Sequence, residues 1–349
     1  MKHHWQSSAR IAGSLTLCAL ALAGCGTSKD ATEPAASTPP PSLTPAAAPA
    51  AKPLTVGYNQ WIGYVGLFEA VDKGYFKDAG LDVQPKQFSG PADGVTPLIA
   101  KQLDIDLTTA DTVVLLQPKA TGNPVTNVYV IDTSNGADGV IAQKNFKTVK
   151  DLKGQTVAAT IGQCNELLLL KALEKAGMTE ADVKVTNMDA DTAGAAVLAG
   201  KVAAAVTWEP WLTKASANGA TVIFTSKEAP NTLLDTISVS KSTMDERGAD
   251  VKAFVAAYEK GSAYAMAHPD DAATLAGKYL GTKPEDAKNM LKKVMLYDTA
   301  ANKKLIGTPA APGPVFDIAK NIGTFFVQQK QMPSAPDVSK TFTADYLPG

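Results

Sequence analysis

The chain has 349 residues, of which 19% are charged and 45% hydrophobic, and its formal net charge is −1. This length predicts two domains, each with its own buried core. Nucleic-acid binding requires a basic surface, and no run of Lys and Arg interleaves with aromatic residues here. The composition therefore excludes nucleic acid as a partner and is typical of a soluble globular protein.

The N-terminal segment has the pattern of an export signal. Lys2 and Arg10 make its start positive, residues 11–23 form a short apolar run, and the run ends in the sequence LAGC at residues 22–25. The run is shorter than the ~20 apolar residues that a membrane-spanning helix needs. Small residues before a cysteine match the bacterial lipobox, so we expect cleavage after residue 24 and lipidation of Cys25. An ordinary signal peptide followed by an incidental cysteine is the alternative.

The segment at residues 25–53 is rich in Ala, Pro, Ser and Thr and lacks apolar periodicity. Such a composition favours an extended, partly stiff chain, so the segment is expected to act as a tether behind the lipid. The lipid would hold the protein in the cell envelope, at the outer face of the cytoplasmic membrane or in the periplasm. After cleavage and lipidation Cys164 is the one free cysteine left, which rules out an intramolecular disulfide.

From residue 54 onward, strand and helix patterns alternate, which favours parallel sheets with helical crossovers. The first half contains predicted strands at residues 54–58, 80–85 and 103–107, with helices at 65–73 and 93–101 between them. A second round follows, with strands at 154–160, 183–187, 203–207 and 221–224 and helices at 165–176 and 192–199. From residue 249 the chain is predicted to be helical, at 249–268, 270–280, 283–295 and 314–331.

This order predicts an α/β protein of the bilobal periplasmic-binding-protein fold, type II, with two α/β lobes joined by a two-strand hinge. Lobe 1 is expected to comprise residues 54–141 and 239–349, and lobe 2 residues 142–238. The two crossovers are placed near residues 140–142 and 237–240. Ligands bind open α/β sheets beyond the carboxyl ends of their strands, so the site is expected in the cleft between the lobes.

One stretch carries a family resemblance. Residues 73–83, KGYFKDAGLDV, resemble the KGYFKxxGLDV signature of substrate-binding proteins of the taurine, aliphatic sulfonate and nitrate transport type. The runs at 148–157 and 208–211 fit the same family. The resemblance implies an extracytoplasmic solute-binding lipoprotein of an ABC importer that works as a monomer with a permease and an ATPase. Binding of thiamine-pyrimidine precursors, or a biosynthetic enzyme of the same fold, is the alternative that the family allows.

Candidate ligand contacts are the polar and aromatic residues at the predicted strand ends. Carboxylates beside tryptophans suit an ammonium or guanidinium group, because an aromatic face attracts a cation. Backbone N–H groups at the helix starts near Gln163 and Thr192 suit an anion instead, so taurine, sulfonates and nitrate stay open. The candidates are Asn59, Gln60, Trp61, Ser89, Thr109, Asp111, Asn135, Asp138, Gln163, Glu166, Trp208 and Glu209.

Some candidates have structural alternatives. Asp111 either caps the helix that follows it or contacts the ligand, and Asn165 suits a helix N-cap. His268 is the one histidine beyond the signal segment, and neither a catalytic triad nor a metal-binding motif is recognisable around it. Cys164 is expected to be a structural cysteine rather than a nucleophile. The sequence thus predicts a binding protein with no catalytic residues, no metal and no cofactor.

Overall fold

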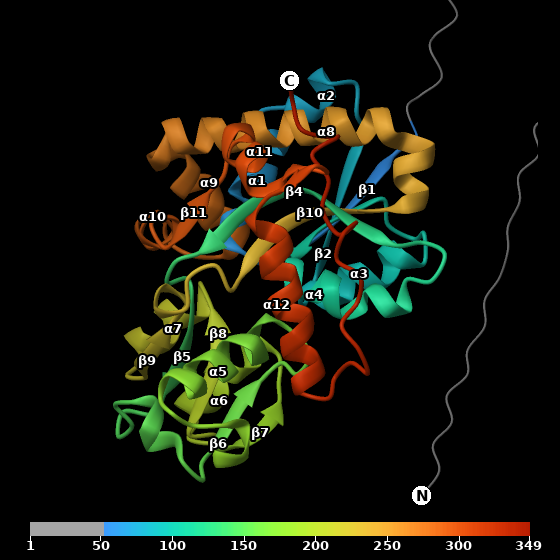
Figure 1. The fold of residues 1–349 in the computed structure, drawn as a ribbon. Helices are drawn as coiled ribbons and strands as arrows, with labels where there is room; N and C mark the ends of the chain where they lie inside the picture. Colours follow the sequence, from blue (N-terminus) through green and yellow to red (C-terminus); the bar gives the residue numbers. More distant parts are fainter. Residues whose placement is uncertain (1–51) are drawn as a thin grey trace, which may run out of the picture. The chain divides into compact units, whose positions relative to one another are not determined.

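The computed structural model describes residues 52–349, so the signal segment, Cys25 and nearly all of the tether lie outside the described residues. Figure 1 shows two α/β lobes, each built around its own sheet. The start of the described chain is held by Arg247, whose guanidinium donates to the carbonyl oxygens of Pro53 and Lys52 at 2.8 Å each.

Lobe 1 contains a six-stranded sheet in the order β11-β4-β10-β3-β1-β2. β1 pairs in parallel with β2 and β3, whereas β10 runs antiparallel between β3 and β4. All ten residues of β4 are buried, as in a strand covered on both faces. The strands are β1 (Leu54–Asn59), β2 (Val83–Phe88), β3 (Ile105–Thr109), β4 (Val125–Ser134), β10 (Leu234–Ser240) and β11 (Val294–Leu296).

The helices of lobe 1 form two groups. α1 packs against α8 and α9, while α3 and α4 pack against the strands of the sheet. Gly261 of α8 lies so close to the backbone of α1 that a Cβ there would overlap the carbonyl oxygen of Gly66, which explains a glycine inside a helix. The helices are α1 (Val65–Asp72), α2 (Tyr75–Asp78), α3 (Pro91–Ile99), α4 (Ala110–Leu116), α8 (Lys241–Ala267), α9 (Pro269–Leu280), α10 (Pro284–Leu291), α11 (Thr299–Ile306) and α12 (Pro314–Gln328).

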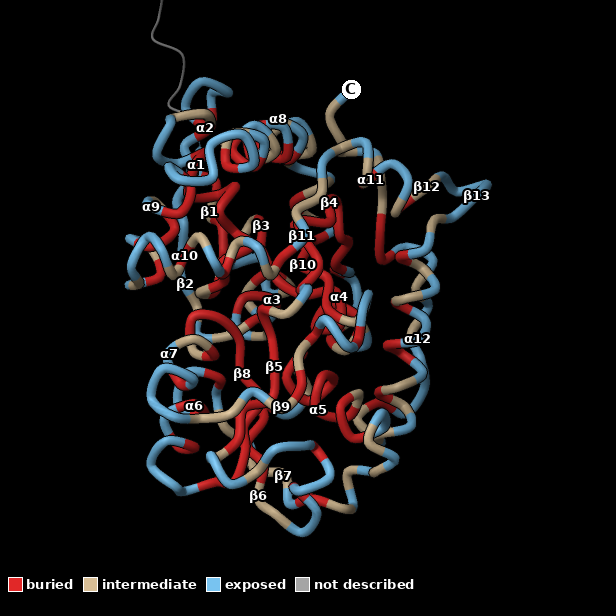
Figure 2. The backbone as a smooth tube through the Cα atoms, turned by 90° about the vertical axis from the view of Figure 1, so that its left-hand side faces the viewer, coloured by how far each residue is buried: buried red, intermediate tan, exposed pale blue. Residues whose placement is uncertain are grey.

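Lobe 2 contains a five-stranded sheet in the order β7-β6-β8-β5-β9. β6 pairs in parallel with β7 and β8, and β5 runs antiparallel between β8 and β9. Figure 2 shows that the buried residues follow the central strands of both sheets, whereas the exposed residues lie on the outer helices and turns and on the edge strands β2 and β7. The elements are β5 (Asp138–Ala142), β6 (Thr156–Ala159), β7 (Lys184–Asn187), β8 (Ala204–Trp208), β9 (Thr221–Thr225), α5 (Cys164–Lys175), α6 (Ala190–Leu198) and α7 (Trp211–Ala217).

The chain crosses between the lobes twice. It leaves lobe 1 between β4 and β5 and returns between β9 and β10, so each crossing lies a few residues before the place expected from the sequence. The two crossings are tied together, because Ser226 Oγ lies 2.7 Å from Ser134 Oγ and accepts the Gly136 N–H at 2.7 Å. They form the two-stranded connection between the lobes.

The sheets differ from the expected parallel arrangement in their connecting strands. β10 of lobe 1 and β5 of lobe 2 are antiparallel to their neighbours, because each lies beside a crossing and has no helical crossover before it. No strand is predicted from the sequence between residues 107 and 140, yet β4 lies there. The helix expected at 283–295 ends at Leu291, and the chain continues into β11.

The C-terminal helix α12 connects the two lobes at their surface. α12 begins in lobe 1 and passes alongside lobe 2 (Figure 1), where Gln331, just beyond it, donates to the Glu166 carboxylate. No helix among residues 52–349 combines the length and the apolarity that crossing a bilayer requires.

Candidate ligand-binding site

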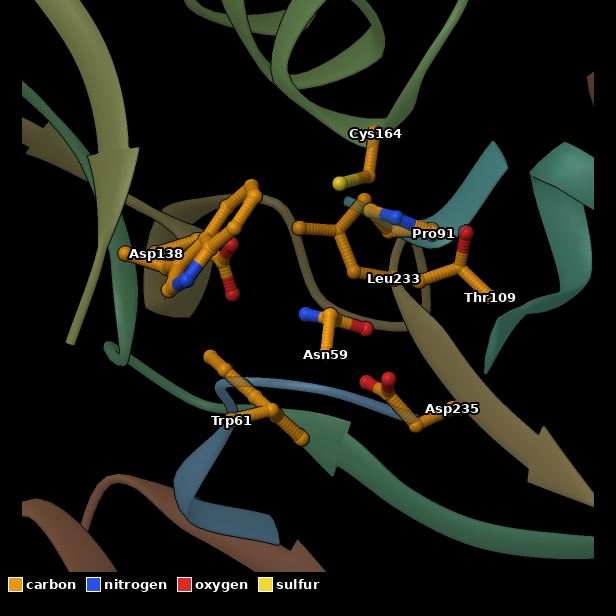
Figure 3. A pocket seen from close by; sticks show the side chains of 9 residues that line it. Asn59, Trp61, Pro91, Thr109, Asp138, Cys164, Leu233 and Asp235 are labelled. Atoms are coloured by element: carbon orange, nitrogen blue, oxygen red, sulfur yellow. The ribbon is translucent and has the colours of Figure 1, made fainter. Parts of the chain in front are cut away.

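A small cavity lies between the lobes, at the carboxyl ends of β1, β3 and β8 and the amino ends of the antiparallel strands β5 and β10. Its volume is ≈ 20 Å³, which by the same measure holds about one water molecule. β1, β3 and β10 of lobe 1 and β5, β8 and α5 of lobe 2 each contribute to the wall. The lining residues are Asn59, Trp61, Pro91, Thr109, Asp138, Cys164, Trp208, Leu233 and Asp235, and Figure 3 shows the side chains.

Trp61 follows the end of β1, where its extended backbone begins a short 3-10 turn. Its indole Nε1 donates to Asp132 Oδ2 at 3.1 Å, and both side chains are buried. Because this bond uses the polar atom of the indole, Trp61 offers the cavity aromatic carbon. Asp132 lies in β4 behind Trp61, and its Oδ1 has no hydrogen-bond partner among the described residues.

Asp235 enters the cavity from β10. The Tyr64 hydroxyl donates to Asp235 Oδ1 at 2.8 Å and lies 3.5 Å from Asn59 Oδ1. Tyr64 is completely buried, so it fixes the carboxylate at the floor of the site. Burial and the nearby Asp132 carboxylate raise the pKa of Asp235 well above its ordinary value.

Asp138 faces the cavity from the other lobe, at the start of β5 (Figure 3). Its backbone N–H donates to Ser134 Oγ at 3.2 Å. Burial raises the pKa of Asp138 to about 7, with a further rise caused by the Asp111 and Glu209 carboxylates. Burial likewise raises the pKa of Asp111 to about 6 and that of Asp132 to about 8.

Trp208 closes the site from lobe 2. It ends β8, and its indole Nε1 donates to the backbone carbonyl oxygen of Gln60 at 3.0 Å. This hydrogen bond joins the two lobes directly beside the cavity. Trp208 also borders a larger outer groove of ≈ 440 Å³, which is lined by Gln60, Gln87, Phe88, Ser89, Asp93, Asp191, Trp208 and Trp211.

The sequence-predicted site residues fall into three groups. Those that line the cavity are Asn59, Trp61, Thr109, Asp138 and Trp208. Those that line the outer groove are Gln60, Ser89 and again Trp208. The others, which line neither, are Asp111, Asn135, Gln163, Glu166 and Glu209.

Two members of the last group have other partners. Glu166 accepts the Gly162 N–H at 2.8 Å and a hydrogen bond from Gln331, so its carboxylate is used within the protein. Glu209 is fully buried and accepts the Thr213 N–H and hydroxyl at 3.0 Å each. Lys293 of lobe 1 forms an ion pair with Glu209, with 2.5 Å between Lys293 Nζ and Glu209 Oε1. This ion pair links the two lobes.

The other three lie near the cleft or on the surface. Gln163 precedes α5, and its amide lies beside Gly90 of the opposite lobe, where a Cβ would come to 3.1 Å. Asn135 is exposed in the first crossing. Asp111 is buried in the first turn of α4, yet neither of its carboxylate oxygens has a hydrogen-bond partner among the described residues. The N-cap of α4 is Thr109, so Asp111 does not cap this helix.

Sequence reasoning missed Asp132 and Asp235 completely. Both are single acids inside apolar strands, in the runs VYVIDTS of β4 and LLDTISV of β10. An acid at such a position is rarely buried without a reason, and this is the signal that identifies them. Cys164 was expected to be structural, and it is buried in the cavity wall. Burial and the carboxylates of Asp111, Asp138 and Asp235 raise the pKa of its thiol, which keeps it protonated.

The acids of the site are not placed like metal ligands. Within residues 52–349, no group of three or more His, Cys, Asp or Glu side chains is arranged to hold a metal ion. The site therefore consists of carboxylates, two indoles and an amide around a small enclosed space.

The two-lobed fold with a cavity between the lobes is that of the periplasmic binding proteins. A model of the family described as NMT1/THI5 like matches residues 61–272, and the chain belongs to this family. The resemblance found in the sequence is thereby confirmed at the level of the family.

Curated relatives agree with this class. The chain is 25% identical over 310 residues to a protein of Brucella abortus that is named as a binding protein, a match that covers 84% of this chain and 91% of the relative. It is 27% identical over 345 residues to the riboflavin-binding protein RibY of Chloroflexus aurantiacus, covering 90% of this chain and 94% of that protein.

Solved structures share the fold. The alkanesulfonate-binding protein SsuA of Xanthomonas axonopodis pv. citri, bound to MOPS, matches with a TM-score of 0.70 at 17% identity, over 85% of this chain and 99% of that one. The periplasmic nitrate-binding protein NrtA of Synechocystis matches with a TM-score of 0.66 at 13% identity, over 84% and 86%. At these identities the likeness concerns the fold, and the expected bilobal architecture is confirmed.

Proposed function

We propose that this protein captures a small nitrogen- or sulfur-containing solute in the interlobe cavity and presents it to the permease and ATPase of an ABC importer. The observation that carries the proposal is the composition of the cavity wall, to which both lobes contribute side chains. A ligand that contacts both lobes favours their closed arrangement, and this is how binding becomes a signal for a transporter.

The proposal includes the location of the protein. Cleavage after residue 24 and a lipid on Cys25 would anchor a monomer in the cell envelope, with residues 26–53 as the spacer. Labelling of cells with a radioactive fatty acid tests this part. The wild-type chain is expected to carry label, whereas a Cys25→Ala variant is not.

The proposed role requires no chemistry. Cys164, the one free cysteine of the described residues, is buried, and its thiol is held in the neutral form. His268 stacks on Tyr264 with ring centroids 4.1 Å apart and lies on α8–α9, away from the cavity wall. These placements support binding rather than catalysis.

A thermal-shift screen of the full chain tests the function. Sulfonates, nitrate, amines, guanidines, pyrimidines and flavins are added in turn, because a ligand of the native state raises the melting temperature by mass action. We expect one class to give a rise that Trp208→Ala abolishes. Trp211→Ala is the matched control, since Trp211 follows three residues later and lines the outer groove but not the cavity.

Closure provides an independent measurement. Small-angle scattering is expected to show a decrease in the radius of gyration when the stabilising compound is added. A broad library that produces neither a thermal shift nor a change in scattering would contradict the proposed function.

A further inference from the structure

The charge around the cavity has one sign. Asp138 and Asp235 line it from opposite lobes, and Asp111 and Asp132 lie close enough to raise the pKa values of these acids. None of the nine lining residues is a Lys, Arg or His. Lys293, the base of the ion pair between the lobes, is already paired with Glu209. An anion placed here would face carboxylates without a compensating base.

The carboxylates around the cavity have few donors: Tyr64 donates to Asp235 and Trp61 to Asp132. Asp138 is 5% exposed and points into the cavity (Figure 3), and the Ser134 hydroxyl beside it is the one group that lowers the pKa of its carboxyl against burial. Both oxygens of Asp111 and Oδ1 of Asp132 are without a partner within residues 52–349. Asp111 and Asp132 do not line the cavity, so a ligand there reaches Asp138 and Asp235. Buried carboxylates with few donors are costly, and N–H groups of a ligand reduce this cost.

Trp61 and Trp208 form the aromatic walls of the cavity. The indole N–H of Trp61 is used by Asp132, and that of Trp208 by the Gln60 carbonyl. Both residues therefore present aromatic carbon to the cavity, one from each lobe. Aromatic carbon attracts a desolvated cation and has no favourable charge for an anion.

The two helix starts that suited an anion in the sequence already carry their own acids. At the start of α5, Glu166 accepts the Gly162 N–H at 2.8 Å. At the start of α6, Asp191 accepts the Thr192 N–H at 2.7 Å. These carboxylates occupy donors that an anionic ligand would need and cancel the favourable end of each helix dipole.

We propose, building on the solute-binding function above, that the ligand is a small cation with several N–H donors, of the guanidinium or amidinium class. Asp138 and Asp235 hold it from the two lobes, with Trp61 and Trp208 as aromatic walls. The cavity of ≈ 20 Å³ holds about one water molecule, so the lobes must separate to admit the cation, and the most compact members of the class fit best. A quaternary ammonium ion fits less well, because it has no N–H group to donate to these carboxylates.

Binding of this ligand releases protons. The carboxyl groups around it are partly protonated at neutral pH, and a cation selects their ionised forms. With one carboxyl of pKa about 7 at Asp138, the Kd is expected to fall ~10-fold between pH 6 and pH 8. An anion would show the opposite trend. The titratable or charged groups that face Asp138 or lie next to it are Asp111, Asp132, Cys164, Glu209, Asp235, Tyr64 and Lys293.

Isothermal titration calorimetry of the full chain tests the proposal with guanidinium and methylguanidinium chloride at sub-denaturing concentrations. Tetramethylammonium, taurine and nitrate are the comparison ligands. We expect a guanidinium compound to bind at least 100-fold more tightly than any comparison ligand, with proton release that shows as a dependence on the ionisation enthalpy of the buffer. Asp138→Asn is expected to weaken this binding at least 30-fold, whereas Asp72→Asn, an exposed position on α1, leaves it unchanged.

The pH trend of the wild-type protein needs no variant, so a folding defect in Asp138→Asn does not obscure the result. Tighter binding of taurine or nitrate than of the guanidinium compounds would overturn the cation assignment and leave the solute-binding function intact. The same holds if another compound of the thermal-shift library binds while no N–H cation does. If no compound binds and none causes closure, the result contradicts both the cation assignment and the solute-binding function.

Discussion

Trp61 Nε1 and Asp132 Oδ2 are joined by a buried hydrogen bond of 3.1 Å that links the end of β1 to β4. The bond holds an aromatic wall of the cavity and supplies a donor to a carboxylate that has few others. It also lowers the pKa of Asp132, in opposition to burial, which raises it to about 8. This hydrogen bond thus positions the Trp61 ring and favours the ionised form of Asp132.

Trp61→Phe removes the donor and keeps most of the ring. Asp132 would then be buried with neither oxygen satisfied, so we expect the free energy of unfolding at pH 8 to fall by about 1–3 kcal/mol. Denaturant unfolding measures the loss. Trp211→Phe serves as the control, because Trp211 is only half-buried, and an equal loss in both variants would show that the Trp61–Asp132 bond has no special weight.

Gly63→Ala tests the same bond from the backbone. A Cβ at Gly63 would overlap both Asp132 Oδ2 and Trp61 Nε1. We expect the variant to lose ligand affinity at least 10-fold and to lose about 1–3 kcal/mol of stability, because the bond is displaced. At Gly248 the added Cβ lies 3.6 Å from the Tyr346 hydroxyl, an ordinary contact, so Gly248→Ala should leave ligand affinity unchanged. Full affinity in Gly63→Ala would contradict the assigned geometry.

Asp138 makes the ligand-free protein less stable as the pH rises. Its pKa is about 7 in the folded protein against an ordinary value of 3.8, so between pH 4 and pH 7 the folded state keeps a proton that the unfolded state has lost. The stability from this group is complete below pH 4, falls through this window and is constant above it.

Asp138→Asn removes this fall in stability between pH 4 and pH 7. We expect the ligand-free variant to be more stable than wild type at pH 8 by roughly 2–4 kcal/mol and equally stable near pH 4, since a buried charge is replaced by a neutral isostere. Denaturant unfolding across pH 4–8 measures the difference. Asp72→Asn should follow the wild-type curve, and a variant that is less stable than wild type at pH 8 would show that Asp138 has a stabilising partner.

The Lys293–Glu209 ion pair joins the two lobes. Glu209 is completely buried and Lys293 is partly exposed, so Lys293→Met leaves a buried carboxylate without its base. We expect the ligand-free variant to populate the open form, with a larger radius of gyration in small-angle scattering and a weaker Kd. Lys292→Met, at the exposed neighbouring position, is the control, and identical scattering of both variants would exclude a closing role for the pair.

Some residues of the cavity wall could be predicted from the sequence, whereas the partners of several predicted acids could not. Asn59, Trp61, Thr109, Asp138 and Trp208 lie in the cavity wall because strand ends converge at one edge of an open sheet. Glu166 and Glu209 also lie beside strand ends, yet they bind Gln331 and Lys293, which are far away along the chain. Partners at such separations leave no local pattern, so the sequence could not show that these acids were already used.

The sequence by itself determined the alternation of strands and helices and the family, because periodicity and the KGYFKDAGLDV motif are local properties. It also identified the strand ends as the place of the site. Only the tertiary structure brought Asp235 of β10 to the same cavity as Asp138 and placed Asp132 of β4 behind Trp61. The charge of the site depends on burial and on distances between lobes, which are set by packing across the whole body and not by any single segment.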